Sequence, residues 1–166
     1  LNGRDIRSLS AAEIKAYFAV VYQDYGKYQL PVREQLQLGN ADLADPEIAA
    51  LLEQTGLAQK VGSLPLGADA PFGKLEPGSA DLSEGQWQRL TLARSFGKQA
   101  KLLVLDEPAA ALDALAESRI YRIIRDIGAG RCTTTLYVTH RLAAARSADE
   151  IIVMKDGQII EQGTHA

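Results

Sequence analysis

The sequence has little cysteine, no long apolar run and no excess of basic residues, and each absence excludes a class of protein. Among the 166 residues Cys132 is the only cysteine, which excludes an internal disulfide framework and suits a reducing compartment. No apolar run approaches the roughly 18 residues that a membrane-spanning helix requires. The formal net charge is −3, so no basic surface dominates and no nucleic-acid partner is expected.

A Gly-x-x-x-x-Gly-Lys-Ser/Thr loop is also absent from the sequence. In many nucleotide-binding proteins the backbone amides and the lysine of such a loop hold the phosphates. The sequence also lacks repeats and low-complexity tracts. Its apolar fraction of 46% is enough to bury a sizeable core as one domain, with or without a small subdomain.

A run of four branched apolar residues, 102–105, ends abruptly in two acids, Asp106 and Glu107. Such a run is typical of a strand buried on both faces of a parallel sheet. Two carboxylates at its end are costly to bury without a cation or a donor. An isolated acid pair is equally consistent with a strand that surfaces into a polar loop. The helix predicted over 84–97, which begins with a Ser-x-Gly-Gln turn, favours a magnesium–nucleotide site instead.

Polar residues also follow two further strands predicted to be buried, at 18–22 and 133–139. Gln23 comes after the first of these strands and His140 after the second. Because ligands of open α/β sheets bind at the carboxyl ends of the strands, Gln23, Glu107 and His140 are expected at one edge. Ser83 and Gly85 lie at a predicted helix start, where free amides and the helix dipole favour an anion.

The other predicted elements follow from apolar spacing, caps and turn residues. They are a short helix capped by Ser10, a helix after Pro31, a helix near Pro46 with an apolar face, a helix with an isoleucine stripe at 120–127, and a hairpin around Lys155-Asp156-Gly157.

Three blocks of the sequence, in this order and spacing, resemble ABC-type ATPases. Leu82-Ser83-Glu84-Gly85-Gln86 resembles the signature motif, residues 102–107 resemble the Walker B strand with its catalytic glutamate, and residues 108–113 resemble the D-loop. Gln23 then matches the Q-loop glutamine and His140 the switch histidine. The chain looks most like the nucleotide-binding domain of an exporter-type ABC transporter.

This resemblance implies the role of each site residue. Glu107, His140 and Gln23 would be catalytic, and Asp106 and Gln23 would hold Mg²⁺. Four residues would bind nucleotide: Ser83, Gly85, Gln86 and Asp113. For Ser83 and Gly85 the contact would be to the γ-phosphate of ATP bound to an opposite subunit. The implied partners are a second nucleotide-binding domain, in a head-to-tail dimer, and the transmembrane domains of a transporter at the cytoplasmic face of the membrane.

The implied fold is α/β: a partial P-loop NTPase (RecA-like) core with a mainly parallel sheet, plus the ABC helical subdomain. The expected divisions are 1–25 (core with Q-loop), 26–100 (helical subdomain with signature motif) and 101–166 (core with Walker B, D-loop, switch histidine and hairpin). We expect the chain to be the later part of such a domain, inactive alone, with exposed apolar sheet surface and a tendency to self-associate.

The sequence departs from the family pattern at three residues. Glu84 stands where the family usually has glycine, and Ala109 and Ala110 replace common Thr and Ser. Because a carboxylate beside a phosphate site is unfavourable, we expect the Glu84 side chain to point into water. A loop at 64–78 loosely matches a short acidic motif by which exporters contact the membrane domain, and either Lys74 or Glu76 would hold its place.

Several alternatives stay open. Tyr25, Tyr28 and Leu30 either pack onto the core or form a surface that grips a helix of the membrane domain. The parent protein is either the motor domain of an exporter or a soluble ABC-type ATPase of DNA repair or translation. A third possibility is a non-catalytic fragment or interaction module that keeps the fold.

Overall fold

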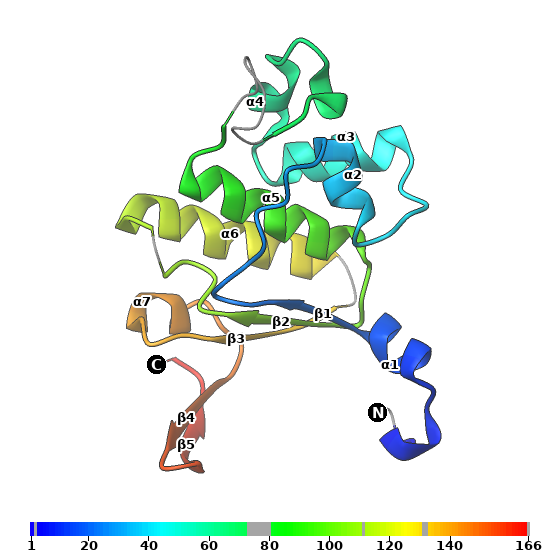
Figure 1. Cartoon of the computed structure of the whole chain (residues 1–166). Helices are drawn as coiled ribbons and strands as arrows, with labels where there is room; N and C mark the ends of the chain where they lie inside the picture. The colour runs from blue at the N-terminus through cyan, green and yellow to red at the C-terminus, as the bar shows by residue number, and fades with distance from the viewer. Residues whose placement is uncertain (2, 73–80, 111, 131–132, 166) are drawn as a thin grey trace.

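The computed structural model describes residues 1, 3–72, 81–110, 112–130 and 133–165. It contains two sheets and seven α-helices within those residues (Figure 1). The helices are α1 (Ala11–Tyr17), α2 (Val32–Gln37), α3 (Asp45–Gln54), α4 (Ala58–Gly62), α5 (Glu84–Gly97), α6 (Ala114–Gly130) and α7 (Leu142–Ala145), with short 3₁₀ turns η1 (Ile6–Ser8) and η2 (Gly67–Asp69). The possible contact-motif residues Lys74 and Glu76 lie outside the described residues.

A three-stranded parallel sheet holds the strands whose ends carry the predicted site. It is built from β1 (Phe18–Val21), β2 (Leu102–Asp106) and β3 (Thr134–Val138), in the order β1-β2-β3. Val21 pairs with Leu105, and Asp106 pairs with Val138, so all three strands end at the same edge. The predicted parallel α/β sheet, with its polar residues following neighbouring strands, is therefore confirmed.

Within the described residues, helices cover one face of this sheet and leave the other uncovered (Figure 1). In Figure 1, α5 and α6 lie on one side of the strands, and the residues facing them, such as Val21, Leu103 and Leu105, are at most 3% exposed. On the opposite face, Leu136 is 51% exposed and Val138 is 55% exposed. The prediction of strands buried on both faces is therefore wrong for this chain. The expected exposure of apolar sheet surface is confirmed.

The central helix of the structure is α5. Its first turn is closed by a capping box, in which Ser83 and Gln86 exchange side-chain and backbone hydrogen bonds. The helix contacts β1 on one side and both α2 and α3 on the other, as Figure 1 shows. Residues around its whole circumference are consequently buried: Trp87, Gln88, Leu90, Thr91, Leu92, Ala93, Phe96 and Gly97.

The remaining elements follow the predicted caps and periodicities. Ser10 and Glu13 form a capping box at α1, and a proline lies in the first turn of α3. The isoleucine stripe of α6 faces the core through Ile120, Ile124 and Ile127. Strands β4 (Ile151–Lys155) and β5 (Gln158–Gly163) pair antiparallel, and Asp156 and Gly157 both adopt positive φ, as the hairpin signal predicts.

Candidate functional site

Glu107 and His140 meet at the carboxyl edge of the parallel sheet. Glu107 directly follows β2, adopts a left-handed conformation with φ 44°, and donates its backbone N–H to the Val138 carbonyl at 3.0 Å. The Nδ1 atom of His140 lies 2.7 Å from Oε1 of Glu107. The His140 side chain is 67% exposed and the Glu107 side chain 25% exposed, so this interacting imidazole and carboxylate are both accessible to solvent.

Asp106 and Gln23 lie at the same edge, and among the described residues neither side chain forms a hydrogen bond or ion pair with Glu107 or His140. Asp106 is the last residue of β2 and is half-buried, whereas Gln23 is exposed two residues beyond the end of β1. In the described part of the chain, no ion pair involves Asp106 and no cluster of three acidic, histidine or cysteine residues forms a metal site. The structure therefore joins Glu107 to His140 and leaves Asp106 and Gln23 as neighbours of the pair along the sheet edge.

The predicted signature residues form the start of α5. The Ser83 backbone N–H donates to Gln86 Oε1 at 2.9 Å, and Ser83 Oγ accepts from the Gln86 backbone N–H at 3.4 Å. Gln86 thus has a structural role as a cap. A Cβ atom at Gly85 would lie 3.4 Å from the Leu112 side chain, so the start of α5 is close to the segment after β2.

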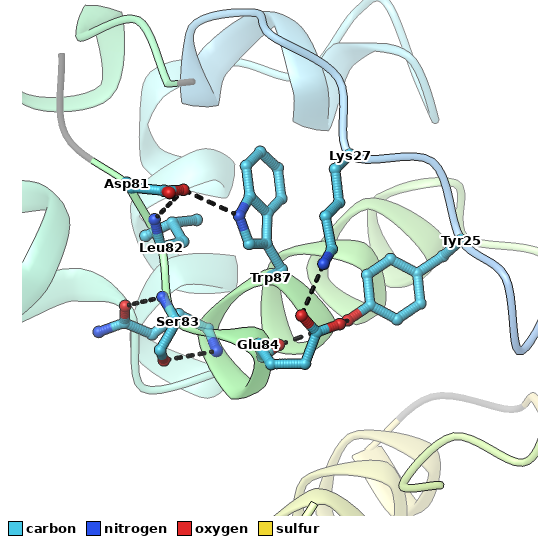
Figure 2. Close-up of polar contacts among 8 residues, drawn as sticks. Tyr25, Lys27, Asp81, Leu82, Ser83, Glu84 and Trp87 are labelled. Carbon is cyan, nitrogen blue, oxygen red and sulfur yellow. Dashed lines mark hydrogen bonds and ion pairs between the residues drawn. The ribbon is translucent and has the colours of Figure 1, made fainter. Parts of the chain in front are cut away.

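The Glu84 side chain is 45% exposed, in keeping with our expectation, but its carboxylate is also bound by two donors of the chain (Figure 2). Its carboxylate accepts a hydrogen bond from the Tyr25 hydroxyl at 2.6 Å and forms an ion pair with Lys27 Nζ, also at 2.6 Å. Lys27 and then Tyr25 lower the pKa of the Glu84 carboxyl, and burial followed by the bond to Glu84 raises the pKa of the Tyr25 hydroxyl. Two donors from the segment after β1 therefore reach the first residue of α5, which the sequence did not predict.

The structure decides between core packing and a contact surface for Tyr25, one of the aromatic residues after Gln23. Tyr25 is half-buried and packs against the core, and its hydroxyl donates a hydrogen bond to the Glu84 carboxylate. Tyr28 is 47% exposed, and its ring lies 5.0 Å from the guanidinium carbon of Arg94 on α5. Tyr25 therefore packs onto the core as a loop residue, while a contact role for Tyr28 stays a prediction.

Asp113 caps the start of α6. Its Oδ1 accepts hydrogen bonds from the backbone N–H groups of Leu115 at 3.0 Å and Ala116 at 2.9 Å. The side chain is exposed, so the predicted part in nucleotide binding is compatible with this role and stays a prediction.

Sequence reasoning missed an ion pair next to the histidine. Arg141 pairs with Glu117 of α6, donates a second hydrogen bond to the Ala110 carbonyl at 3.0 Å, and its backbone N–H bonds Thr139 Oγ1 at 3.1 Å. Glu117 is 8% exposed. The only sequence signal is the position of Arg141 directly after His140. The contacts join the segment after β3 to the segment after β2.

A second missed contact fastens α5 to the end of the β2 segment. The Gln88 side-chain amide, which is buried, donates to the Pro108 carbonyl. Pro108 is fully buried and Ala109 is 1% exposed, so a residue larger than alanine would need space that the packing does not provide here.

Comparison with known proteins places the chain in a family. The family model described as "ABC transporter" matches residues 1–110. The chain is 36% identical, over 89% of its length, to the nisin transport ATP-binding protein NisT of Lactococcus lactis subsp. lactis. It is 34% identical to the mitochondrial iron-sulfur clusters transporter ATM1 of Saccharomyces cerevisiae and 35% identical to the ATP-dependent lipid A-core flippase of Neisseria meningitidis serogroup A, each over 99% of the chain.

A solved structure agrees with these relatives. The chain superimposes on a bacterial Atm1-family ABC exporter with ATP bound, with a TM-score of 0.84, 28% sequence identity and 99% of the chain covered. The matched regions make up 24% to 26% of those three relatives and 28% of the solved exporter chain. Among the described residues, no helix has both the length and the apolar character needed to cross a bilayer. Because the family model matches most of the chain and these relatives agree with it, the chain belongs to the ABC transporter family.

Proposed function

We propose that this chain forms part of the nucleotide-binding domain of an ABC exporter and supplies groups that hydrolyse ATP. The observation that carries the proposal is the 2.7 Å contact between His140 Nδ1 and Glu107 Oε1 at the carboxyl edge of the sheet. Glu107 would orient and polarise the water that attacks the γ-phosphate. His140 would hydrogen-bond the phosphate and the water as charge moves, since positioning and electrostatic stabilisation supply most of the catalysis in phosphoryl transfer.

The residues at this edge fit Mg²⁺. Magnesium prefers hard oxygen ligands, keeps several waters and is often bound through one or two carboxylates. Asp106 offers one carboxylate that has no ion-pair partner among the described residues, and Gln23 offers an amide oxygen at the neighbouring strand end. Asp106, through water, and Gln23 would hold the ion, which would neutralise charge on the phosphates.

The start of α5 would contact ATP bound to an opposite subunit. Support comes from the exposed Ser83 hydroxyl and Asp113 carboxylate, and from the proximity of Gly85 to Leu112, which brings the two motifs together. The helix dipole at the first turn favours an anion, with Ser83, Gly85 and Gln86 as the contacting residues. Two such domains would enclose two ATP molecules head to tail.

These 166 residues contain no match to the pattern of a phosphate-binding loop, and we propose that such a loop is supplied from outside them. We propose that the chain alone does not turn over ATP, and that the longer polypeptide carrying both the loop and transmembrane domains does so at the cytoplasmic face of the membrane. The divisions 1–25, 26–100 and 101–166 would be the corresponding core and helical parts. Without the loop, the isolated chain would keep only the fold and its contact surfaces.

The alternative of a soluble ATPase in DNA repair or translation has less support. That class requires a surface suited to nucleic acid, and the net charge is −3. The relatives described above are transport proteins by name.

The test is the variant Glu107→Gln in the longer polypeptide. We expect kcat for ATP to fall by about 100-fold or more, the scale of a lost general base, while ATP still binds. Glu161→Gln, on exposed β5, is the matched control and should leave kcat unchanged. Normal turnover by Glu107→Gln would remove Glu107 from the mechanism.

A further inference from the structure

The segment that follows Gln23 reaches α5 through side chains alone. Residues 22–29 take no part in any backbone–backbone hydrogen bond recorded for the described residues outside helices and strands. Instead, Tyr25 and Lys27 contact Glu84, and Tyr28 stacks with Arg94 ten positions further along the same helix. The position of this segment therefore depends on a small number of side-chain contacts with α5.

The contacts at Glu84 form one connected group. The Tyr25 hydroxyl donates to Glu84 Oε1 at 2.6 Å and approaches the Glu84 carbonyl oxygen at 3.4 Å. Lys27 Nζ donates to Glu84 Oε2 at 2.6 Å and lies 5.9 Å from the Tyr25 ring centroid. Each carboxylate oxygen of Glu84 thus accepts a hydrogen bond (Figure 2). The Tyr25 ring also packs against the core.

We propose that Tyr25, Lys27 and Glu84 form a clasp that positions the segment after Gln23 against the first turn of α5. The inference rests on the proposed function, in which Gln23 and the start of α5 both serve the nucleotide. Gln23 lies two residues before Tyr25, and Ser83 lies directly before Glu84. The clasp therefore sets the two site segments relative to each other. Its members are positioning residues and do not contact the reacting atoms.

The clasp also accounts for an acid at this place in the sequence. A free carboxylate in the first turn of α5 would repel phosphate. Lys27 supplies one positive charge to that carboxylate at ion-pair distance, and Tyr25 supplies a hydroxyl donor. A glycine, the usual residue of the family here, offers neither oxygen to these donors. The clasp is thus a property of chains that carry an acid at this position.

The first arm of the test measures order in the 166-residue chain itself. Amide ¹⁵N relaxation should give order parameters near 0.85 for residues 24–28 in the wild type and below about 0.6 in Glu84→Ala. Asp126→Ala, which removes another exposed ion pair with Arg125, is the matched control and should change nothing at 24–28. Unchanged order parameters in Glu84→Ala would overturn the clasp.

The second arm measures ATP hydrolysis by the longer polypeptide. We expect Glu84→Ala to lower kcat about 10-fold and Tyr25→Phe about 3-fold, with KM unchanged within about 2-fold, because a positioning group acts mainly on the reacting complex. The double variant should be no slower than Glu84→Ala, since both changes break one clasp. Glu84→Gln keeps an acceptor for Tyr25 and should lie between wild type and Glu84→Ala.

The positioning role would be overturned if the kcat losses of Tyr25→Phe and Glu84→Ala multiplied in the double variant. An unchanged kcat in Glu84→Ala would overturn it as well. A wild-type longer polypeptide that hydrolyses no ATP would overturn the proposed function and the catalytic purpose of the clasp together. The relaxation measurement separates these outcomes, because it tests the clasp without nucleotide.

Discussion

The imidazole of His140 and the carboxylate of Glu107 share a 2.7 Å contact although the two residues are 33 positions apart in the sequence. The contact exists because β2 and β3 are parallel neighbours and because the Glu107 N–H is bonded to the Val138 carbonyl. An ionised carboxylate can only accept, so the Nδ1–H group of His140 is the donor. This leaves Nε2 free of that bond and available for a ligand.

The first prediction concerns the two histidines of the chain. His140→Ala in the longer polypeptide should lower kcat for ATP by about 100-fold or more, because the contact to Glu107 and the donor to phosphate are both lost. His165→Ala changes an exposed residue near the end of the chain and serves as the control. Equal rates for the two variants in a steady-state ATPase assay would show that His140 has no catalytic part.

A second prediction concerns the ion pair of Arg141 and Glu117. Arg141→Met leaves the carboxylate of Glu117, which is 8% exposed, without its partner. We expect the free energy of unfolding to fall by about 2–4 kcal/mol, as measured by urea denaturation of the 166-residue chain.

The double variant Arg141→Met/Glu117→Leu is the control for that mechanism. It removes the unpaired charge as well as the pair, and should be more stable than Arg141→Met alone. A double variant that is less stable than either single variant would contradict this explanation.

A third prediction concerns the close approach of α2 and α5. A Cβ atom at Gly39 would collide with the Arg94 backbone carbonyl oxygen, so Gly39→Ala should destabilise the chain by about 1–3 kcal/mol. Gly62→Ala is the matched control, because nothing lies within 4 Å of a Cβ atom there. The comparison requires only thermal or urea unfolding, and equal stability of the two variants would refute the proposed collision.

The fourth prediction is a pH dependence at Glu84. Lys27 and Tyr25 hold the folded-state pKa of this carboxyl below its ordinary value of 4.5. A lowered folded pKa adds stability that is fully present above the unfolded value and disappears as pH falls through the folded value. At pH 7 the free energy of unfolding of the wild type should therefore exceed that of Glu84→Gln by about 1 kcal/mol or less, because the pair is exposed. In strong acid the difference should disappear.

Urea unfolding of both chains at several pH values checks the fourth prediction. A difference between wild type and Glu84→Gln that is independent of pH would contradict it.

A fifth prediction follows from the uncovered sheet face. Val20 on β1 is 41% exposed, and Leu136 and Val138 on β3, the other edge strand, are each more than half exposed. Apolar surface of this kind favours association, so the 166-residue chain should self-associate as its concentration rises. Leu136→Gln should weaken the association in sedimentation experiments, whereas a wild-type monomer at high concentration would count against it.

The elements that the sequence predicts well are those with local signals. The start of α5 at the Ser-x-Gly-Gln turn, the isoleucine stripe of α6 and the Asp156–Gly157 turn each depend on residues close in sequence. The grouping of polar residues at one sheet edge was also predictable, because parallel strands share the direction of their carboxyl ends.

The features that the sequence did not predict depend on contacts between distant segments. Lys27 and Glu84 are 57 positions apart, and Arg141 and Glu117 are 24 apart. Neither pair has a spacing that marks it in the sequence. The prediction that β2 is buried on both faces failed for a related reason. The apolar run at 102–105 does not show which face of the sheet the helices cover.

The measurement that tests the account most directly is a calorimetric titration with Mg²⁺ and a non-hydrolysable ATP analogue. We predict no binding to the 166-residue chain and clear binding to the longer polypeptide that carries a phosphate-binding loop. Binding to the 166-residue chain alone would show that Gln23, Asp106 and His140, or a second copy of the chain, hold nucleotide without that loop, and would contradict the account.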